Sequence, residues 1–294
     1  MTFAPDTGVL LVAHGTVEDL DDLAAFVARI RHGRPAPPGL VAELRQRYEA
    51  IGGSPLLRTT HEQARALARR LEVPVLVAMR LWDPSVEQAL AGAAALGLRR
   101  LVMIALAPFS QHVYWNAACE AAARAGTGIE LVRTDAWGEE PEFVDAQVDL
   151  IERHAPPGAA LVLSAHSLPR PVIERGDPYA QLVEASARAI TTRLGWSGRP
   201  SQLCYQSQGA DGGDWLGPGV RETLAALAGQ GQRSVAWAPV GFLADHVETL
   251  YDLDIEAGGI ARELGIQLAR VPALNLHPGL IGALSTVAKR AVSS

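Results

Sequence analysis

Short, continuous apolar runs alternate along the chain with longer stretches in which apolar residues recur at helical spacing. A continuous run predicts a strand covered on both faces, because a half-exposed strand alternates apolar and polar positions. Such runs predict strands at residues 8–13, 75–79, 101–106, 129–133, 160–165, 202–205, 235–239 and 267–270. The helical spacing predicts helices at residues 19–31, 40–51, 60–71, 85–96, 115–125, 141–154, 179–194 and 220–228, and further helices that begin near His246 and at Pro278.

The alternation runs twice, with Pro156-Pro157-Gly158 as the predicted linker between the two rounds. Strands that alternate with helices indicate parallel sheets covered by helices. We therefore predict an α/β protein of two similar halves with a cleft between them. In open parallel sheets, ligands bind beyond the carboxyl ends of the strands. Candidate site residues are thus those that follow the apolar runs, at residues 14–16, 108–110, 166–167 and 239–245.

Composition excludes several classes of protein. The longest apolar run, residues 101–109, contains a proline and is far shorter than the roughly 20 residues of a membrane span. A net charge of −6 gives no general electrostatic reason to bind nucleic acid. Cys119 and Cys204 are too few for an iron–sulfur cluster held by four thiolates or for a disulfide framework. With no signal peptide apparent at the N-terminus, we expect a protein of the reducing cytoplasm.

His166 directly follows a predicted strand, within SAHSLP at residues 164–169. A neutral imidazole at this edge could bind a metal or accept a proton, or it could simply cap the end of the strand. A serine hydrolase is disfavoured, because no G-x-S-x-G motif occurs in the chain.

Three acidic residues, Glu248, Asp252 and Glu256, are spaced four apart where a helix is predicted to follow a strand. On an α-helix this spacing forms one acidic stripe. The stripe is either an ordinary solvated face or a path for a hydrated divalent cation such as Mg²⁺ or Fe²⁺, since carboxylates suit hard cations.

Two other segments could contact a flat, anionic ligand. Arg47 and Tyr48 end a predicted helix before a Gly-Gly turn and Ser54, an arrangement that could present donors to a carboxylate or could be an ordinary helix end. The loop at residues 109–115, with Tyr114 and Trp115, is rich in aromatics for a chain with only 5% of them. It suits a flat apolar ligand, and local packing is an equally good interpretation.

Four motifs together resemble the ferrochelatase family, in the expected order and over almost the whole chain. They are RYEAIGGSPL at residues 47–56, SAHSLP at 164–169, YQSQG with WLGP within 205–218, and PVGFLADHVETLYDLD at 239–254. The resemblance implies a chelatase-like fold of two Rossmann-like domains, at residues 1–156 and 157–294, with the last helix packing back on the first. It also implies a lyase of haem biosynthesis that inserts Fe²⁺ into a porphyrin and releases two protons.

The resemblance also implies roles for individual residues. His166 and Glu248 match the pair that binds Fe²⁺ and accepts protons, and Asp252 and Glu256 match the acidic line that leads to it. Residues that match porphyrin contacts are Arg31, Arg47, Tyr48 and Ser54, and more loosely Tyr114 and Trp115. His14 stands where compact members of the family carry a tyrosine that can ligate the product iron from the opposite face, which is a departure from the family.

We therefore expect a porphyrin substrate, a haem product, no organic cofactor, no iron–sulfur cluster, no nucleic acid partner and a monomer, with Mg²⁺ as a candidate for the outer acidic site. The choice between coproporphyrin III and protoporphyrin IX is open. One alternative is a porphyrin- or haem-binding protein without turnover, which His14 motivates because imidazole is a strong iron ligand. Another is a cobalt or nickel chelatase acting on a related tetrapyrrole.

Overall fold

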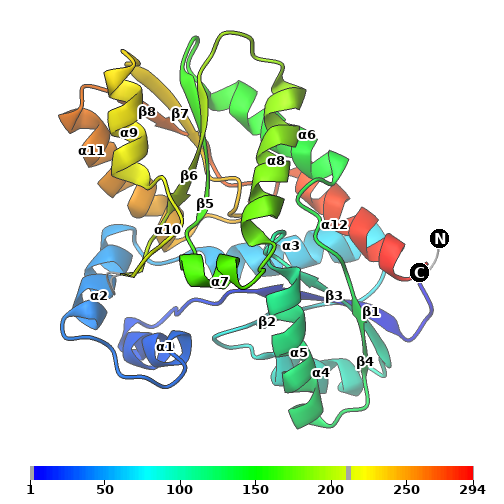
Figure 1. The fold of residues 1–294 in the computed structure, drawn as a ribbon. Coiled ribbons are helices and arrows are strands. Elements are labelled where there is room, and N and C mark those ends of the chain that lie inside the picture. The colour runs from blue at the N-terminus through cyan, green and yellow to red at the C-terminus, as the bar shows by residue number, and fades with distance from the viewer. Residues whose placement is uncertain (1–2, 210–212, 294) are drawn as a thin grey trace. The chain divides into compact units, whose positions relative to one another are not determined.

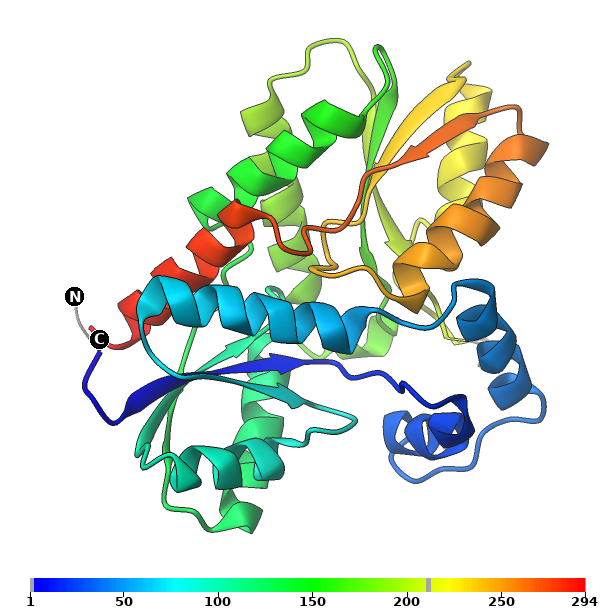
Figure 2. The ribbon, with the colours of Figure 1, turned by 180° about the vertical axis from the view of Figure 1, so that it is seen from behind.

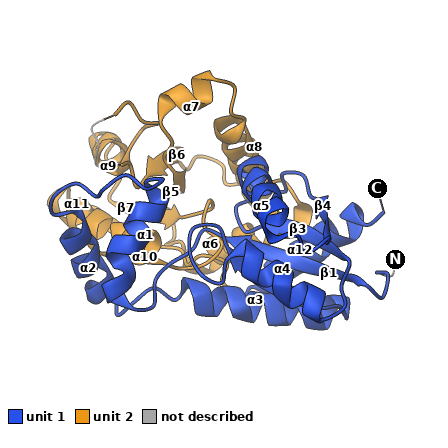
Figure 3. Ribbon diagram, turned by 90° about the horizontal axis from the view of Figure 1, so that it is seen from below, with its two compact units in different colours: residues 1–137, 276–294 blue, residues 138–275 orange. Residues whose placement is uncertain are grey.

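The computed structural model describes residues 3–209 and 213–293. The chain forms two compact units (Figure 3): Met1–Trp137 with Leu276–Ser294 form unit 1, and Gly138–Asn275 form unit 2. Each unit contains a four-stranded parallel sheet flanked by helices (Figure 1). None of the helices in the described part of the chain has the length and apolar character that a membrane span requires.

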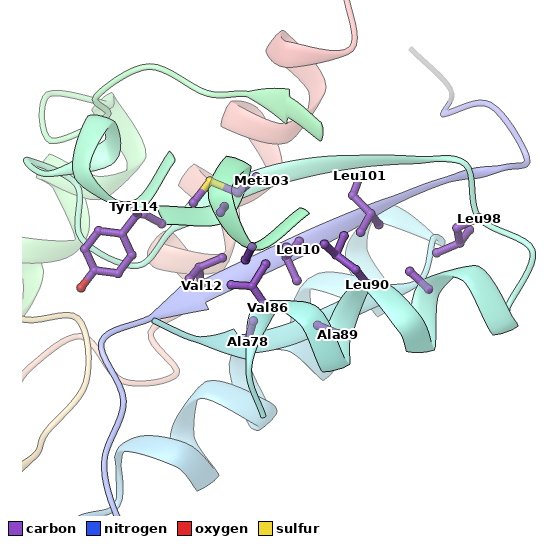
Figure 4. Packing of buried hydrophobic residues seen from close by; sticks show 14 residues of the cluster. Leu10, Val12, Ala78, Val86, Ala89, Leu90, Leu98, Leu101, Met103 and Tyr114 are labelled. Atoms are coloured by element: carbon purple, nitrogen blue, oxygen red, sulfur yellow. The ribbon is translucent and has the colours of Figure 1, made fainter. Parts of the chain in front are cut away.

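The sheet of unit 1 has the strand order β2-β1-β3-β4, in which β1 and β3 are central. One face is covered by α4 and α5, which bury Leu10, Val12 and Met103 in one apolar cluster (Figure 4). Because Val9 and Leu11 are buried as well, β1 is apolar at successive positions, as expected for a doubly covered strand. The strands are β1 (Thr7–Ala13), β2 (Val75–Met79), β3 (Arg100–Ala105) and β4 (Glu130–Arg133). The helices are η1 (a 3₁₀-helix, Leu20–Asp22), α1 (Leu23–Ile30), α2 (Leu40–Ala50), α3 (Leu56–Leu71), α4 (Val86–Ala95), α5 (Gln111–Ala125) and α12 (Pro278–Ala291).

The sheet of unit 2 has the order β6-β5-β7-β8, so both sheets order their strands second, first, third, fourth along the sequence. Its apolar cluster includes Val162, Trp237, Leu224 and Ile260, which come from the sheet, α9 and α11. The strands are β5 (Ala160–His166), β6 (Ser201–Gln206), β7 (Ser234–Ala238) and β8 (Gln267–Arg270). The helices are α6 (Pro141–His154), α7 (Arg170–Glu174), α8 (Tyr179–Leu194), α9 (Val220–Gly229), α10 (Val247–Leu250), the π-helix η2 (Asp252–Ala257) and α11 (Gly258–Glu263).

Each predicted strand is present to within one residue at either end, and the α/β fold with two parallel sheets is confirmed. The helices differ more. Residues 19–31 form a 3₁₀-turn followed by a short α-helix, α3 and α5 begin four residues earlier than predicted, and α7 was not predicted. The helix predicted from about His246 is present from Val247, and it is divided into α10, the π-helix and α11.

The division between the units falls at Trp137 and Gly138, one helix earlier than the predicted linker. The reason is that α6 packs on α8 of the second unit. Pro156 instead belongs to a tight turn between α6 and β5, in which its carbonyl accepts a hydrogen bond from the Ala159 N–H at 3.1 Å. The helix α12 belongs to unit 1, where it packs on α3 and β3 (Figure 2).

Candidate active site

His166 is the last residue of β5, and hydrogen bonds fix both its backbone and its ring. The Tyr179 hydroxyl donates a hydrogen bond to the His166 carbonyl at 2.9 Å. The ring Nδ1 contacts the Ser167 carbonyl, which can only accept, so Nδ1 carries the proton in this bond. The other ring nitrogen, Nε2, therefore carries the lone pair of the neutral imidazole and can accept a proton or bind a metal.

Glu248 lies against that nitrogen. Its Oε2 is 3.6 Å from His166 Nε2, and the two side chains are 28% and 37% exposed, so a substrate can reach both. The pair forms because β5 and β7 are neighbours and the segment after β7 crosses the end of β5. At that crossing the Gly241 N–H donates to the Ser164 carbonyl at 3.0 Å, and a Cβ on Gly241 would lie 2.8 Å from Ala165 Cβ. Only glycine fits this approach without displacing the backbone.

His246 is a site residue that sequence reasoning did not single out. Burial lowers the pKa of His246, although the charges of Glu248 and Asp245 act in the opposite direction. Its Nδ1 is buried and has no hydrogen-bond partner within the described residues. A neutral imidazole therefore lies next to the His166–Glu248 pair. The available sequence signal was its position two residues before Glu248, in the segment that follows a strand.

A partly buried ion-pair network holds the start of α10. The Asp245 carboxylate accepts hydrogen bonds from Arg270 Nη1 at 2.8 Å, Thr249 Oγ1 at 3.2 Å and Asn275 Nδ2 at 2.8 Å. Arg270 also donates through Nε to Asp254 at 2.6 Å. Burial alone would lower the pKa of Arg270, but the hydrogen bond and charges of the two aspartates raise it. The guanidinium thus joins β8 to both ends of the segment that carries Glu248.

The predicted acidic residues lie in different surroundings. In the π-helix, the N–H groups of Ile255 and Glu256 both donate to the Tyr251 carbonyl, the wider hydrogen-bond register of such a turn. Asp252 is 7% exposed and accepts a hydrogen bond from Ser207 Oγ at 2.6 Å, whereas Glu256 is exposed. Within residues 3–209 and 213–293, no three His, Cys, Asp or Glu side chains are grouped so as to hold a metal ion. Of the four acidic and imidazole groups predicted on this side, the structure brings together His166 and Glu248.

In unit 1, the loop that follows β1 carries His14 and is tied to two other segments. His14 is exposed, and its carbonyl accepts a hydrogen bond from the Leu81 N–H at 3.0 Å. The Thr16 hydroxyl is 3.0 Å from the Tyr48 hydroxyl, which joins this loop to α2. The fold of unit 1 thus places the predicted residues His14 and Tyr48 near one another.

The remaining polar residues predicted in unit 1 have local partners. Arg31 Nε donates to the Pro35 carbonyl at 3.1 Å. Arg47 forms an ion pair with Glu43 at 2.7 Å on the same helix. Ser54 Oγ accepts from the Leu56 N–H at 3.4 Å at the beginning of α3.

The aromatic residues predicted to contact a ligand are packed in unit 1. Tyr114 is 6% exposed and belongs to the apolar cluster of unit 1 (Figure 4). Trp115 packs against the same cluster. Trp82 was missed by the sequence analysis. It directly follows Leu81, the residue bonded to His14, and the Arg29 guanidinium lies 4.2 Å from its ring centre. Arg29 also forms an ion pair with Asp83 at 3.7 Å, so its guanidinium lies between the ring and a carboxylate.

Comparisons with known proteins bear on this site. The sequence pattern that defines the family described as Ferrochelatase matches residues 6–292. The coproporphyrin III ferrochelatase of Anoxybacillus flavithermus is 38% identical over 300 residues, which cover 95% of this chain and 94% of that protein. The ferrochelatase of Herpetosiphon aurantiacus is 35% identical over 302 residues, covering 96% of this chain and 97% of that protein.

Solved structures show the same fold at low sequence identity. SirB from Bacillus subtilis with Fe³⁺ has a TM-score of 0.59 and 15% identity, covering 97% of this chain and 95% of that one. The sirohydrochlorin chelatase SirB in complex with cobalt has a TM-score of 0.56 and 14% identity, with coverage of 98% and 96%. The structural likeness extends to the fold alone, whereas the sequence matches are long and close. This protein belongs to the ferrochelatase family.

Proposed function

We propose that this protein inserts Fe²⁺ into a porphyrin as a lyase of haem biosynthesis, and that coproporphyrin III is the porphyrin. The observation that carries the proposal is the 3.6 Å separation of His166 Nε2 and Glu248 Oε2, which puts two proton acceptors side by side at the end of a parallel sheet. Relatives with the name coproporphyrin III ferrochelatase, at 36–38% identity, support the choice of porphyrin.

Insertion of Fe²⁺ requires that two pyrrole N–H groups lose their protons while the nitrogens bind the metal. His166 Nε2 would accept one proton, because its Nδ1 already carries a hydrogen held by the Ser167 carbonyl. The Glu248 carboxylate would accept the other, directly or through the neutral imidazole of His246. Fe²⁺ is a substrate in this scheme, and no organic cofactor is needed because proton acceptance and metal binding are supplied by side chains and the ring.

The two alternatives from the sequence analysis differ in their support. A cobalt or nickel chelatase finds support only in the fold likeness to SirB at 14–15% identity, which carries no information on the substrate. A haem-binding protein without turnover is favoured by one observation, the exposed imidazole of His14 after β1. Such a protein would bind haem tightly and show no insertion with wild-type His166 and Glu248.

An anaerobic insertion assay with Fe²⁺ tests the proposal. We expect His166→Ala to lower kcat by about 100-fold or more, the usual size of a general base contribution, while fluorescence quenching shows that coproporphyrin III still binds. His154→Ala is the control, because His154 lies in the same unit and its Nδ1 bonds to the Leu150 carbonyl within α6. Full activity in His166→Ala, or preference of the wild type for protoporphyrin IX, would contradict the proposal.

A further inference from the structure

Three polar side chains lie in the interior of the sheet of unit 2. Ser164 on β5, Gln206 on β6 and Trp237 on β7 are 0%, 1% and 0% exposed. A buried polar group costs free energy unless it is hydrogen-bonded. We call these three residues the polar triad, since they bond to one another in series.

The direction of each bond in the polar triad follows from the tryptophan. An indole N–H can only donate, and Trp237 Nε1 donates to Ser164 Oγ at 2.8 Å. The serine hydroxyl therefore points its own hydrogen elsewhere, and it donates to Gln206 Oε1 at 2.6 Å. With its oxygen committed to Ser164, the Gln206 amide must present its NH₂ group on the opposite side.

That NH₂ group reaches the segment that carries the candidate acid–base pair. Gln206 Nε2 donates to the backbone carbonyl of Glu248 at 2.7 Å. The backbone carbonyl of Gln206 accepts a hydrogen bond from the Ser167 N–H at 2.7 Å. Gln206 is also the register partner of His166 across β5 and β6. Gln206 is thus bonded at once to the strand end that holds His166 and to the helix that holds Glu248.

We propose that the polar triad is a positioning device that sets the separation of His166 and Glu248. An apolar set of three residues would fill a sheet interior without any hydrogen-bond requirement, and replacing both partners of a buried bond by apolar groups is often nearly neutral for stability. The series of hydrogen bonds instead ends outside the sheet, at the backbone carbonyl of Glu248. Trp237, Ser164 and Gln206 are therefore positioning residues, and their effect on turnover rests on the proposed function.

Steady-state kinetics with coproporphyrin III and Fe²⁺ test the inference. We expect Trp237→Phe, Ser164→Ala and Gln206→Met each to lower kcat by about 10- to 100-fold, the range caused by displacing a reacting group by up to about 1 Å, with the porphyrin KM changed less than twofold. Ser186→Ala and Trp137→Phe are matched controls. Each removes a buried donor to a backbone carbonyl, Gly138 and Ala105 respectively, and neither carbonyl belongs to the segment that carries Glu248. Each should keep the wild-type kcat.

A double variant tests whether Trp237 and Ser164 affect kcat through the same series of hydrogen bonds or independently of each other. If the residues act through Gln206 alone, Trp237→Phe combined with Ser164→Ala will be no slower than the slower single variant. Losses that multiply, an unchanged kcat in the single variants, or equal losses in the matched controls would overturn the proposal.

A crystal structure of Ser164→Ala makes the test independent of activity. We expect Gln206 Nε2 to leave the Glu248 carbonyl and the distance from His166 Nε2 to Glu248 Oε2 to exceed the present 3.6 Å. An unchanged pair geometry would refute the positioning role even if the wild type is active. A changed geometry in a protein whose wild type inserts no iron would refute the proposed function and leave the positioning role standing.

Discussion

Tyr205 is a buried residue whose hydroxyl adds no hydrogen bond, within the described part of the chain, that would stabilise the fold. It is 5% exposed, and no partner for its hydroxyl oxygen occurs among the described residues. An unsatisfied buried polar atom costs about 1–3 kcal/mol, so we expect Tyr205→Phe to leave the free energy of unfolding at pH 7 unchanged or raise it. Urea denaturation of the variant and the wild type measures the difference. Tyr179→Phe is the contrasting variant, since the Tyr179 hydroxyl donates to the His166 carbonyl, and it should lose about 1 kcal/mol.

Tyr205 also makes the free energy of unfolding decrease at high pH. Burial, with a smaller effect from the charge of Glu184, raises the pKa of Tyr205 from 10.0 to about 12. Between these values the unfolded chain has released a proton that the folded protein keeps, so the free energy of unfolding decreases as pH rises. Tyr205→Phe should therefore lose less stability than the wild type between about pH 10 and 12. Equal losses in both proteins would contradict the assigned cause.

Cys204 should be inert to thiol reagents in the folded protein. It is fully buried, and burial raises its pKa to about 12, so little thiolate exists at pH 8 and a reagent cannot reach it. Mass spectrometry after brief iodoacetamide treatment is expected to find Cys204 unmodified in the native protein and modified in urea. Modification of native Cys204 at the rate seen for half-buried Cys119 would disprove the expectation.

The sequence allowed the functional role of some residues to be predicted, but not of others. His166 and Glu248 could be predicted, because each follows a strand within a motif, and the structure places them together. Gln206 and Ser164 could not, since their roles depend on Trp237, which lies 73 positions along the chain from its partner Ser164. His246 was missed because its surroundings, and not its motif, lower its pKa.

Ser207 contacts the π-helix from another segment of the chain. Ser207 has a φ of 57°, in the left-handed region, while its hydroxyl holds Asp252. We expect Ser207→Ala to be about 1 kcal/mol less stable than Ser207→Gly, because only glycine adopts this φ without a steric cost. Both variants lose the bond to Asp252, so the difference between them reports the backbone conformation alone. Equal unfolding free energies would mean that the backbone at residue 207 is not strained.

Strands could be predicted well because a doubly covered strand leaves a continuous apolar run in the sequence. The helix after His246 could be predicted but its π-helical register could not, because acidic residues at four-residue spacing are what an exposed α-helix would also show. Residues distant in the sequence contact this segment. Ser207 bonds to Asp252 and Arg270 bonds to Asp254. Neither partner can be predicted from the pattern of residues within the segment.

The two units repeat one strand order, yet their connectivity differs. Unit 2 is continuous from Gly138 to Asn275, whereas unit 1 is completed by the last nineteen residues of the chain, Leu276–Ser294. The proline-rich turn at residues 156–158 resembled a linker because proline and glycine mark any connection between elements. Which unit α6 joins is decided by its apolar face, which packs on α8.

A chain that ends at Asn275 tests whether α12 is a structural part of unit 1. The helix buries Leu280, Ile281, Leu284 and Val287, and it packs on α3 and β3. Losing one buried Leu or Ile to Ala costs about 2–5 kcal/mol, so losing the helix should exceed the roughly 5–15 kcal/mol that keeps a domain folded.

Hydrogen exchange of the truncated chain should show β1 and β3 fully exchanged while β5 and β7, in unit 2, stay protected. A chain that ends at Ala291 keeps all of α12 and is the control, in which both sheets should remain protected. Protected β1 and β3 without α12 would show that α3, α4 and α5 suffice to hold the sheet. Loss of protection in β5 and β7 as well would show that unit 2 cannot fold without unit 1.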